Sequence, residues 1–371
     1  MPLILDNEGA RHLYELCAKN DLTMARIGYS DQDQIQGIVK GAARFASDHG
    51  ISELPIGIFA TVGHYIFQQL PRYLEAGHVL PSQGGDPAKY RRRLLLNAKL
   101  ATDFMSTLTS PQWSDYGAVH VTHHYDHGHH TLPGGVLSKN ELLRDPEFVA
   151  QFSSVMFDDS HSPLAENIEN SLGYKAFLEK EGTPKVLEGC LEEVAAGGEG
   201  LEASAFTNPT HIEEYLGKTA FDLVVPNIGT ESINAKPVGV QWEVLEAIKK
   251  LNVGNRLVVH GFSSIRTLSV EQQRRLGEVG VVAMNAWSYI PQTIGRACLE
   301  RSARILESHN PEQGFPVDFD SSGNPTYDRS NDANVFFGPV LDQVRDFKVR
   351  EITDSVYAIL DNLGYARLGN A

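Results

Sequence analysis

The chain of 371 residues has few cysteines and no long apolar run. Its three cysteines (Cys17, Cys190 and Cys298) are widely separated and form no Cys-x-x-Cys pair. This pattern argues against a disulfide framework and suits a reducing compartment, so we expect a cytoplasmic protein. No apolar segment reaches the roughly 18 residues that cross a bilayer. The first residues lack a basic segment followed by an apolar one, so no signal peptide is expected.

Positive charge is also scarce. The chain has 32 lysines and arginines against 47 aspartates and glutamates, a net charge of −15. An acidic surface repels nucleic-acid backbones and anionic membranes. The run Arg91–Arg93 is too short to reverse this repulsion, so neither partner is expected.

What the chain has is a regular alternation of short apolar runs with longer helical patterns. Such alternation predicts a parallel sheet with helical crossovers, and eight units favour closure into a barrel. We therefore predict one (β/α)8 TIM-barrel domain over residues 1–371. The candidate strands are Met24–Ile27, Pro55–Ala60, Ala118–His123, Ser154–Phe157, Lys185–Cys190, Phe221–Val225, Arg256–Val259 and Val281–Met284.

Helices are predicted between these runs and after them. Clear helical patterns cover Asp33–His49, Gln241–Leu251 and Val270–Val279, with Asp31 or Asp33 capping the first and Ser269 the last. Loop insertions are expected at Gly77–Arg93 and Asn310–Asn334, followed by a C-terminal helix, Val340–Leu363.

The densest chemical signal is VHVTHHYDHGHH, Val119–His130, which holds six of the fourteen histidines. It follows a strand, and in a barrel the carboxyl ends of the strands carry the catalytic groups. In extended chain His124 and Asp126 project to the same side, whereas His127 faces the other way or belongs to the loop. The cluster suits a divalent metal beside a carboxylate for proton transfer. The alternative is a polar, solvated loop, which is the favoured reading for His120, His129 and His130 individually.

Four other strand ends carry weaker signals. VVHGFSS places His260 before a small-residue loop, and PNIGTES places Glu231 after a glycine turn. VMFDDSH offers Asp158, and EGCLEEVAAGGEG offers acids beside a Gly-Gly pair. A structural histidine and solvated carboxylates are the plain alternatives, but five such signals at successive strand ends favour one site.

Read in order, these segments resemble the class II, metal-dependent fructose-bisphosphate aldolase family over most of the chain. The most specific piece is FSSVMFDDSHSPLAENI (Phe152–Ile168). HYDHG (His124–Gly128), GGEG (Gly197–Gly200), HGFSS (His260–Ser264) and MNAW (Met284–Trp287) stand where that family has its other motifs. The long polar insertion is similar to that of the longer subgroup, whose members are dimers, and so implies a homodimer.

The resemblance implies a role for each matching residue. His127 and His260 would bind Zn²⁺ or another divalent ion, and Asp126 would be the acid/base. Asp158 and Glu192 would offer positions for a second metal ion, and Glu199 a catalytic carboxylate on a loop. The implied substrate, a ketose or related hydroxy-carbonyl compound, would contact Gly261, Ser263, Asn285, Ser288 and Thr61.

The sequence departs from the family at the third metal histidine. The equivalent segment, Gly229–Ile233, contains none, and Ser232 takes its place. Glu231 lies one residue away and would complete a His2Glu site, which zinc accepts. The alternatives are His124, His161 or a weakly bound metal.

The phosphate contacts depart as well. Phe262 and Ser264 replace glycines, and a Cβ there blocks close approach of an anion. Trp287 and Tyr289 replace aspartates, and Arg329 is the nearest candidate for the family's C-terminal arginine. We therefore predict an aldolase acting on a compound other than ordinary fructose 1,6-bisphosphate. The alternatives are an epimerase or isomerase using the same enediolate chemistry, and an inactive barrel with a binding role.

Overall fold

The computed structural model describes residues 3–61, 86–128, 139–192, 206–230, 239–251, 253–261, 265–287, 289–309, 318–319, 325–326 and 341–370. Parallel strands form a closed barrel in the order β4-β3-β2-β9-β8-β7-β6-β5, with β5 pairing back to β4. The short β1 (Leu3–Ile4) adds to the beginning of β4. The barrel strands are β2 (Met24–Gly28), β3 (Leu54–Ala60), β4 (Val119–Gly128), β5 (Ser154–Asp158), β6 (Val186–Cys190), β7 (Leu223–Val225), β8 (Leu257–Val259) and β9 (Val281–Ala286). The predicted (β/α)8 TIM barrel is confirmed.

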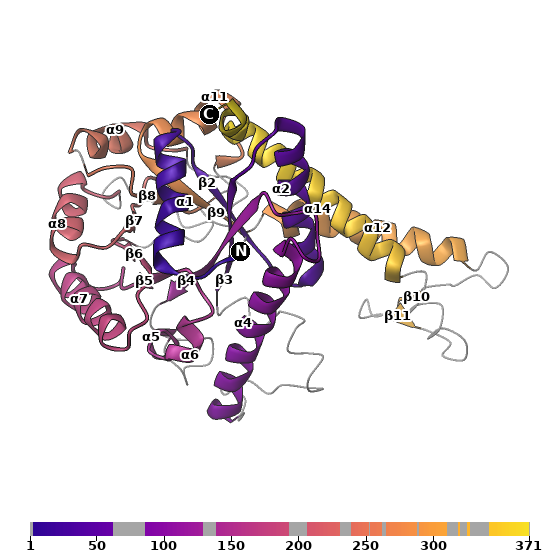
Figure 1. The fold of residues 1–371 in the computed structure, drawn as a ribbon, viewed down its shortest axis with the longest axis horizontal. Helices are drawn as coiled ribbons and strands as arrows, with labels where there is room; N and C mark the ends of the chain where they lie inside the picture. The colour runs from indigo at the N-terminus through magenta and orange to yellow at the C-terminus, as the bar shows by residue number, and fades with distance from the viewer. Residues whose placement is uncertain are drawn as a thin grey trace.

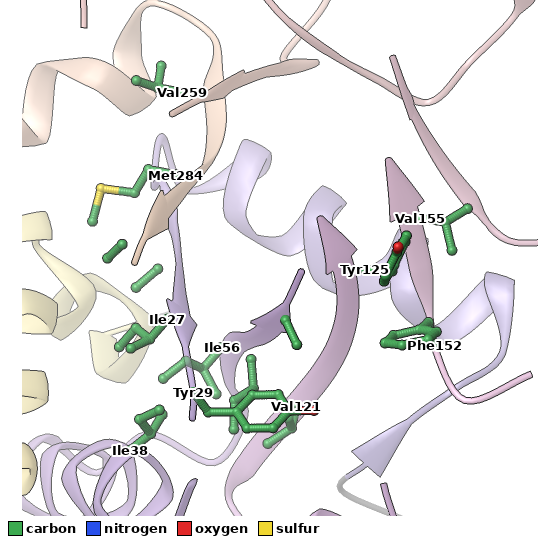
Figure 2. Packing of buried hydrophobic residues seen from close by; sticks show 14 of the residues in the cluster. Ile27, Tyr29, Ile38, Ile56, Val121, Tyr125, Phe152, Val155, Val259 and Met284 are labelled. Atoms are coloured by element: carbon green, nitrogen blue, oxygen red, sulfur yellow. The ribbon is translucent and has the colours of Figure 1, made fainter. Parts of the chain in front are cut away.

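The outer face of the barrel forms the main hydrophobic core. These strands read as continuous apolar runs because both of their faces are buried. Figure 2 shows Ile27, Ile56 and Val121 from neighbouring strands packed with Ile38 of helix α2. All four side chains are fully buried, at 0% exposure.

Helices follow the strands as predicted, and their ends have the expected caps. Asp31, not Asp33, caps α2 by accepting from the Gln34 N–H at 3.0 Å. Ser269 and Gln272 form a capping box at the start of α11. The helices are α1 (Asn7–Lys19), α2 (Gln32–His49), α4 (Pro87–Thr109), α5 (Lys139–Leu143), α6 (Pro146–Val149), α7 (Leu164–Lys180), α8 (Pro209–Thr219), α9 (Trp242–Lys250), α11 (Val270–Glu278), α12 (Tyr289–His309) and α14 (Leu341–Leu363), followed by the 3-10 helix η5 (Tyr365–Asn370).

The predicted C-terminal helix is α14, and it packs along α2. Gly37 and Gly41 lie one turn apart on α2. A Cβ added to Gly37 would lie 2.7 Å from the Ile352 side chain, and one added to Gly41 would lie 2.7 Å from the Thr353 carbonyl oxygen. The two glycines therefore let the helices approach closely. In Figure 1, α12 and α14 project together from the side of the barrel. Within the described part of the chain, no helix is long and apolar enough to cross a membrane.

Helix α1 lies across the N-terminal ends of the strands and crosses in front of them in Figure 1. Its buried face packs on apolar side chains that point into the barrel from β2, β6, β7 and β8. We call this group the N-terminal core. It comprises Ala10, Leu13, Tyr14, Cys17, Leu22, Met24, Val186, Leu223 and Val258, and the same cluster continues to Met156, Cys190, Val225, Val282 and Ala283.

Two predictions about segment limits are corrected. Strand β4 runs to Gly128, five residues beyond the predicted end, because polar residues that looked like a loop point into the barrel. A bulge between Tyr125 and Gly128 accommodates the extension. Residues 87–93 of the predicted insertion Gly77–Arg93 are the start of α4. In the predicted loop Asn310–Asn334, the described residues are the antiparallel pair β10 (Asp318–Phe319) and β11 (Pro325–Thr326).

Candidate active site

The carboxyl ends of β4 and β8 bring three potential metal ligands together. Asp126, His127 and His260 each offer one atom, and these atoms lie within 4.8 Å of one another. We call them the mouth cluster. His127 Nε2 and His260 Nδ1 are 3.1 Å apart. Two imidazole nitrogens on one tetrahedral zinc ion lie about 3.3 Å apart, given Zn–N bonds of about 2.0–2.1 Å. The donor set therefore fits a divalent transition metal.

His127 has a strained backbone and a fixed ring. Its φ of 50° lies in the left-handed region that histidine rarely adopts. Its Nδ1 is 2.8 Å from the Asp158 carboxylate, whose other oxygen accepts from the Ser160 N–H and hydroxyl. An ionised carboxylate only accepts, so Nδ1 carries the proton and Nε2 keeps its lone pair for a ligand. A carboxylate behind a histidine in this way is typical of metal sites.

Asn285 on β9 links two members of the mouth cluster. Its Nδ2 is 2.9 Å from Asp126 Oδ1 and 3.0 Å from His260 Nε2, so one amide group serves both. Its Oδ1 faces the Arg26 guanidinium at 3.4 Å, which fixes the orientation of the amide because arginine only donates. Asn285 therefore sets the position of the carboxylate against the imidazole.

Below the mouth, a second group shares Asp126. His124, Asp126 and Glu188 also offer ligand atoms within 4.8 Å of one another, and all three are buried. We call them the interior cluster. His124 Nε2 lies 3.8 Å from Asp126 and 3.9 Å from Glu188. Arg26 Nη1 donates to Glu188 Oε2 at 2.6 Å, with neither side chain exposed.

The charges of the interior explain its pKa shifts. Burial would raise the pKa of Glu188, but Arg26 and then His124 outweigh burial and lower the pKa to about 2. Burial would also raise the pKa of Asp126, yet His127 and His260 hold it well below its usual range. The pKa of His124 is lowered, first by burial and then by the Arg26 charge. At neutral pH the interior therefore holds ionised carboxylates, a neutral His124 and a cationic Arg26.

One carboxylate oxygen in this network has no hydrogen bond within the described part of the chain. It is Glu188 Oε1, which lies 3.5 Å from His260 Nε2. A buried acceptor without a partner is costly. If a metal took His260 Nδ1, the ring proton would move to Nε2 and face this oxygen, and Asn285 Nδ2 would then donate to Asp126 alone.

Most of the described residues predicted for the site lie together. Asp126, His127, His260, Asp158 and Asn285 form one connected network. Gly261, with a φ of 82°, lies two residues beyond β8 and Thr61 directly follows β3, so both lie at the same end of the barrel. Glu199, Glu231, Ser263 and Ser288 lie outside the described residues.

Glu192 does not belong to either cluster. One of its carboxylate oxygens accepts a hydrogen bond from the Thr207 hydroxyl, and the other is 3.7 Å from His211. Its pKa is raised, chiefly by burial. Of the alternative ligands, His161 is exposed and His124 belongs to the interior cluster.

Two interior residues were missed from the sequence, Arg26 and Glu188. Each is the only charged residue in its buried strand, MARIG and VLEGC. A lone charge in a strand buried on both faces needs a partner of opposite sign. That signal was available, although it does not say which charge pairs with which.

Comparison with known proteins gives a consistent result. The family described as "Fructose-bisphosphate aldolase class-II" matches residues 10–344. A fructose-bisphosphate aldolase of Treponema pallidum (strain Nichols) is 30% identical over 148 residues, which are 34% of this chain and 43% of that protein. The match therefore spans less than half of that relative.

Solved structures show the same fold. A fructose-bisphosphate aldolase of Campylobacter jejuni superposes with a TM-score of 0.64 at 16% identity, covering 98% of this chain and 95% of that one. The YdjI aldolase of Escherichia coli K12 gives a TM-score of 0.58 at 15% identity, covering 96% of each chain. A putative fructose-1,6-bisphosphate aldolase of Coccidioides immitis gives 0.57 at 18% identity, covering 96% and 97%.

Proposed function

This chain belongs to the class II fructose-bisphosphate aldolase family, and we propose that it is a metal-dependent aldolase acting on a hydroxy-carbonyl compound other than ordinary fructose 1,6-bisphosphate. The mouth cluster carries this proposal. In this cluster two imidazole nitrogens lie 3.1 Å apart beside a buried carboxylate. The cluster lies at the carboxyl ends of the strands, where barrel enzymes carry their catalytic groups, in a fold shared with a solved aldolase.

In this proposal His127 and His260 hold a divalent ion, which we take to be zinc, and Glu231 supplies the third ligand. When bound, the ion acts as a Lewis acid on a substrate carbonyl oxygen. Asp158 holds the His127 ring in the orientation that presents Nε2. A second metal position at Asp158 and Glu192 stays a prediction. In this structure Asp158 is hydrogen-bonded to His127 and Glu192 to Thr207.

Asp126 is proposed to transfer the proton. Its carboxylate is held ionised, with Oδ1 accepting from Asn285, so it can take a proton from the substrate hydroxyl as the carbon–carbon bond breaks. Glu199 is proposed as the second carboxylate. Gly261, Ser263, Ser288 and Thr61 are proposed to contact the substrate, and Asn285 to bind it beside Asp126.

An aromatic pair at the mouth supports the altered substrate. Trp287 lies two residues beyond Asn285, and an added Cβ on Gly28 would lie 2.2 Å from its ring. Phe59 is fully buried beside it, with ring centroids 6.3 Å apart, so Trp287 is the ring of the two that can face a substrate. Aromatic faces do not neutralise a phosphate but pack well on the apolar face of an uncharged group. We therefore propose a substrate whose end at this position is not phosphorylated.

Product analysis would test the proposed function. The metal-loaded protein would be incubated with unphosphorylated ketoses, ketose 1-phosphates and fructose 1,6-bisphosphate, beside an Asp126→Asn variant. We expect two carbonyl fragments from a substrate of the first two classes and none from the variant. Isomeric products without cleavage would favour the epimerase or isomerase instead. No turnover of any compound by a metal-loaded protein would favour a binding role.

The homodimer and the cytoplasmic location stay predictions.

A further inference from the structure

The barrel interior holds a built-in cation directly below the mouth cluster. Arg26 points inward from β2 and has 0% exposed surface. Space for it comes from Gly57 on β3, where an added Cβ would lie 2.4 Å from Arg26 Cγ. In register Arg26 is paired with Gly57 on one side and Asn285 on the other. The guanidinium therefore has a fixed place among the interior carboxylates.

Arg26 contacts two of the interior cluster's side chains with the same nitrogen. Nη1 lies 2.6 Å from Glu188 Oε2 and 3.2 Å from His124 Nε2. Arg26 also interacts electrostatically with Asp126, the third member. The three groups that could hold a metal ion thus already surround a positive charge.

The hydrogen bonds of His124 show that the lone pair of Nε2, the atom that could bind a metal, is already taken by Arg26. A guanidinium only donates, so Nε2 must accept from Arg26, and an imidazole nitrogen has a single lone pair. Nδ1 then carries the proton and donates to Ser154 Oγ at 2.8 Å. Neither nitrogen of His124 is left to bind an ion while Arg26 is present.

We infer that Arg26 takes the place of a metal ion in the interior cluster and keeps that cluster free of metal. Arg26 is thereby a positioning residue, because its Nη1 holds Glu188 Oε2 at 2.6 Å below His260 and faces Asn285 Oδ1 beside Asp126. It also excludes His124 as the missing third ligand. The ion in the mouth cluster rests on the proposed function, whereas the exclusion from the interior cluster rests on the Arg26 contacts alone.

The test counts bound ions in proteins with and without the guanidinium. Wild type, Arg26→Ala, Arg26→Ala/Glu188→Ala and the surface control Arg44→Ala would be loaded with Co²⁺ or Zn²⁺, dialysed and measured by inductively coupled plasma mass spectrometry. Arg44 is 44% exposed and pairs with Asp354, so its loss removes an arginine without touching the interior.

We expect about one more ion per chain in Arg26→Ala than in wild type. The extra ion should be lost in the double variant, which lacks the Glu188 ligand, and absent in Arg44→Ala. Equal ion counts in wild type and a folded Arg26→Ala would overturn the inference. If wild type binds no metal, the proposed function fails, but the difference between the two proteins still decides the inference.

A measurement on the wild-type protein covers the case in which Arg26→Ala does not fold. In ¹¹³Cd NMR of the cadmium-loaded protein we expect a mouth-cluster signal that disappears in His127→Ala/His260→Ala, and no signal that depends on Glu188. A further wild-type signal that is lost in Glu188→Gln, which removes a ligand of the interior cluster alone, would overturn the inference, because it would place an ion beside Arg26.

Discussion

In the N-terminal half of the barrel interior, α1 closes the strands over apolar side chains, whereas in the C-terminal half the same strands enclose charged and hydrogen-bonded groups. Tyr14 lies at the boundary, with its ring 5.2 Å from the Arg26 guanidinium and its hydroxyl 3.4 Å from Ser154 Oγ. One half is built by burial of apolar surface, the other around the Arg26–Glu188 ion pair and the hydrogen bond from Asn285 to Asp126. Stability and chemistry are therefore separated along the strands.

The strongest way to sharpen this contrast is to change the proton-transferring group alone. Asp126→Asn keeps an oxygen that can accept from Asn285 and removes only the charge and the proton affinity. We expect kcat to fall by about 10²–10⁴-fold, with thermal unfolding of the metal-loaded protein little changed. A loss of activity matched by unfolding would instead make Asp126 a structural residue. Steady-state kinetics and circular dichroism melts give both readouts.

The next largest effect concerns the charge pair. Glu188→Ala leaves Arg26 buried without its partner, and removing one member of a buried pair costs about 3–5 kcal/mol. Arg26→Met/Glu188→Leu removes both charges and should unfold at a denaturant concentration close to that of wild type. Urea unfolding of the three proteins measures this difference. If Glu188→Ala were as stable as the double variant, the pairing account of the C-terminal half would be wrong.

A matched change in the N-terminal core should affect stability without affecting metal. Leu13 on α1 is 1% exposed, and its truncation to alanine leaves a cavity. We expect a loss of about 2–5 kcal/mol in the free energy of unfolding and an unchanged metal content. Leu172→Ala, at a position 42% exposed on α7, serves as the control with little change. Loss of metal from a folded Leu13→Ala would break the separation of the two halves.

The smallest effect is a pH dependence from a buried histidine outside the site. Burial lowers the pKa of His123 to about 3, and its Nδ1 lies 2.8 Å from the Gln151 carbonyl oxygen. The unfolded chain takes up a proton below its ordinary pKa of about 6.5 while the folded protein does not, so stability falls as the pH falls from 6.5 towards 3.

Between pH 7 and pH 5 this difference amounts to about 2 kcal/mol. His123→Asn, which retains a donor near Gln151, should unfold with a pH dependence weaker by that amount. Urea unfolding at the two pH values makes the comparison. Identical slopes for wild type and variant would show that His123 does not contribute.

Much of the fold and of the mouth cluster could be predicted from the sequence. Apolar runs alternating with helical patterns gave the strands, and the convergence of strand ends in a barrel placed His127 near His260, 133 residues away. The end of β4 was misjudged because inward polar residues such as Asp126 have the composition of a loop.

The interior cluster could not be predicted, for a geometric reason. Arg26 and Glu188 are 162 residues apart, and their contact depends on the register of the strands and on the space that Gly57 leaves. A local sequence pattern contains neither the strand register nor the space beside Gly57. The third metal ligand is equally hard to predict from a local pattern, and Glu231 in that role stays a prediction. The single domain over residues 1–371 also stays a prediction.

Metal analysis of the purified protein beside His127→Ala/His260→Ala tests the central claim most directly. We expect about one zinc or similar divalent ion per chain in the wild type and none in the variant, with both proteins folded by circular dichroism. A wild type that binds no divalent ion after reconstitution, or a variant that binds as much as wild type, would contradict it.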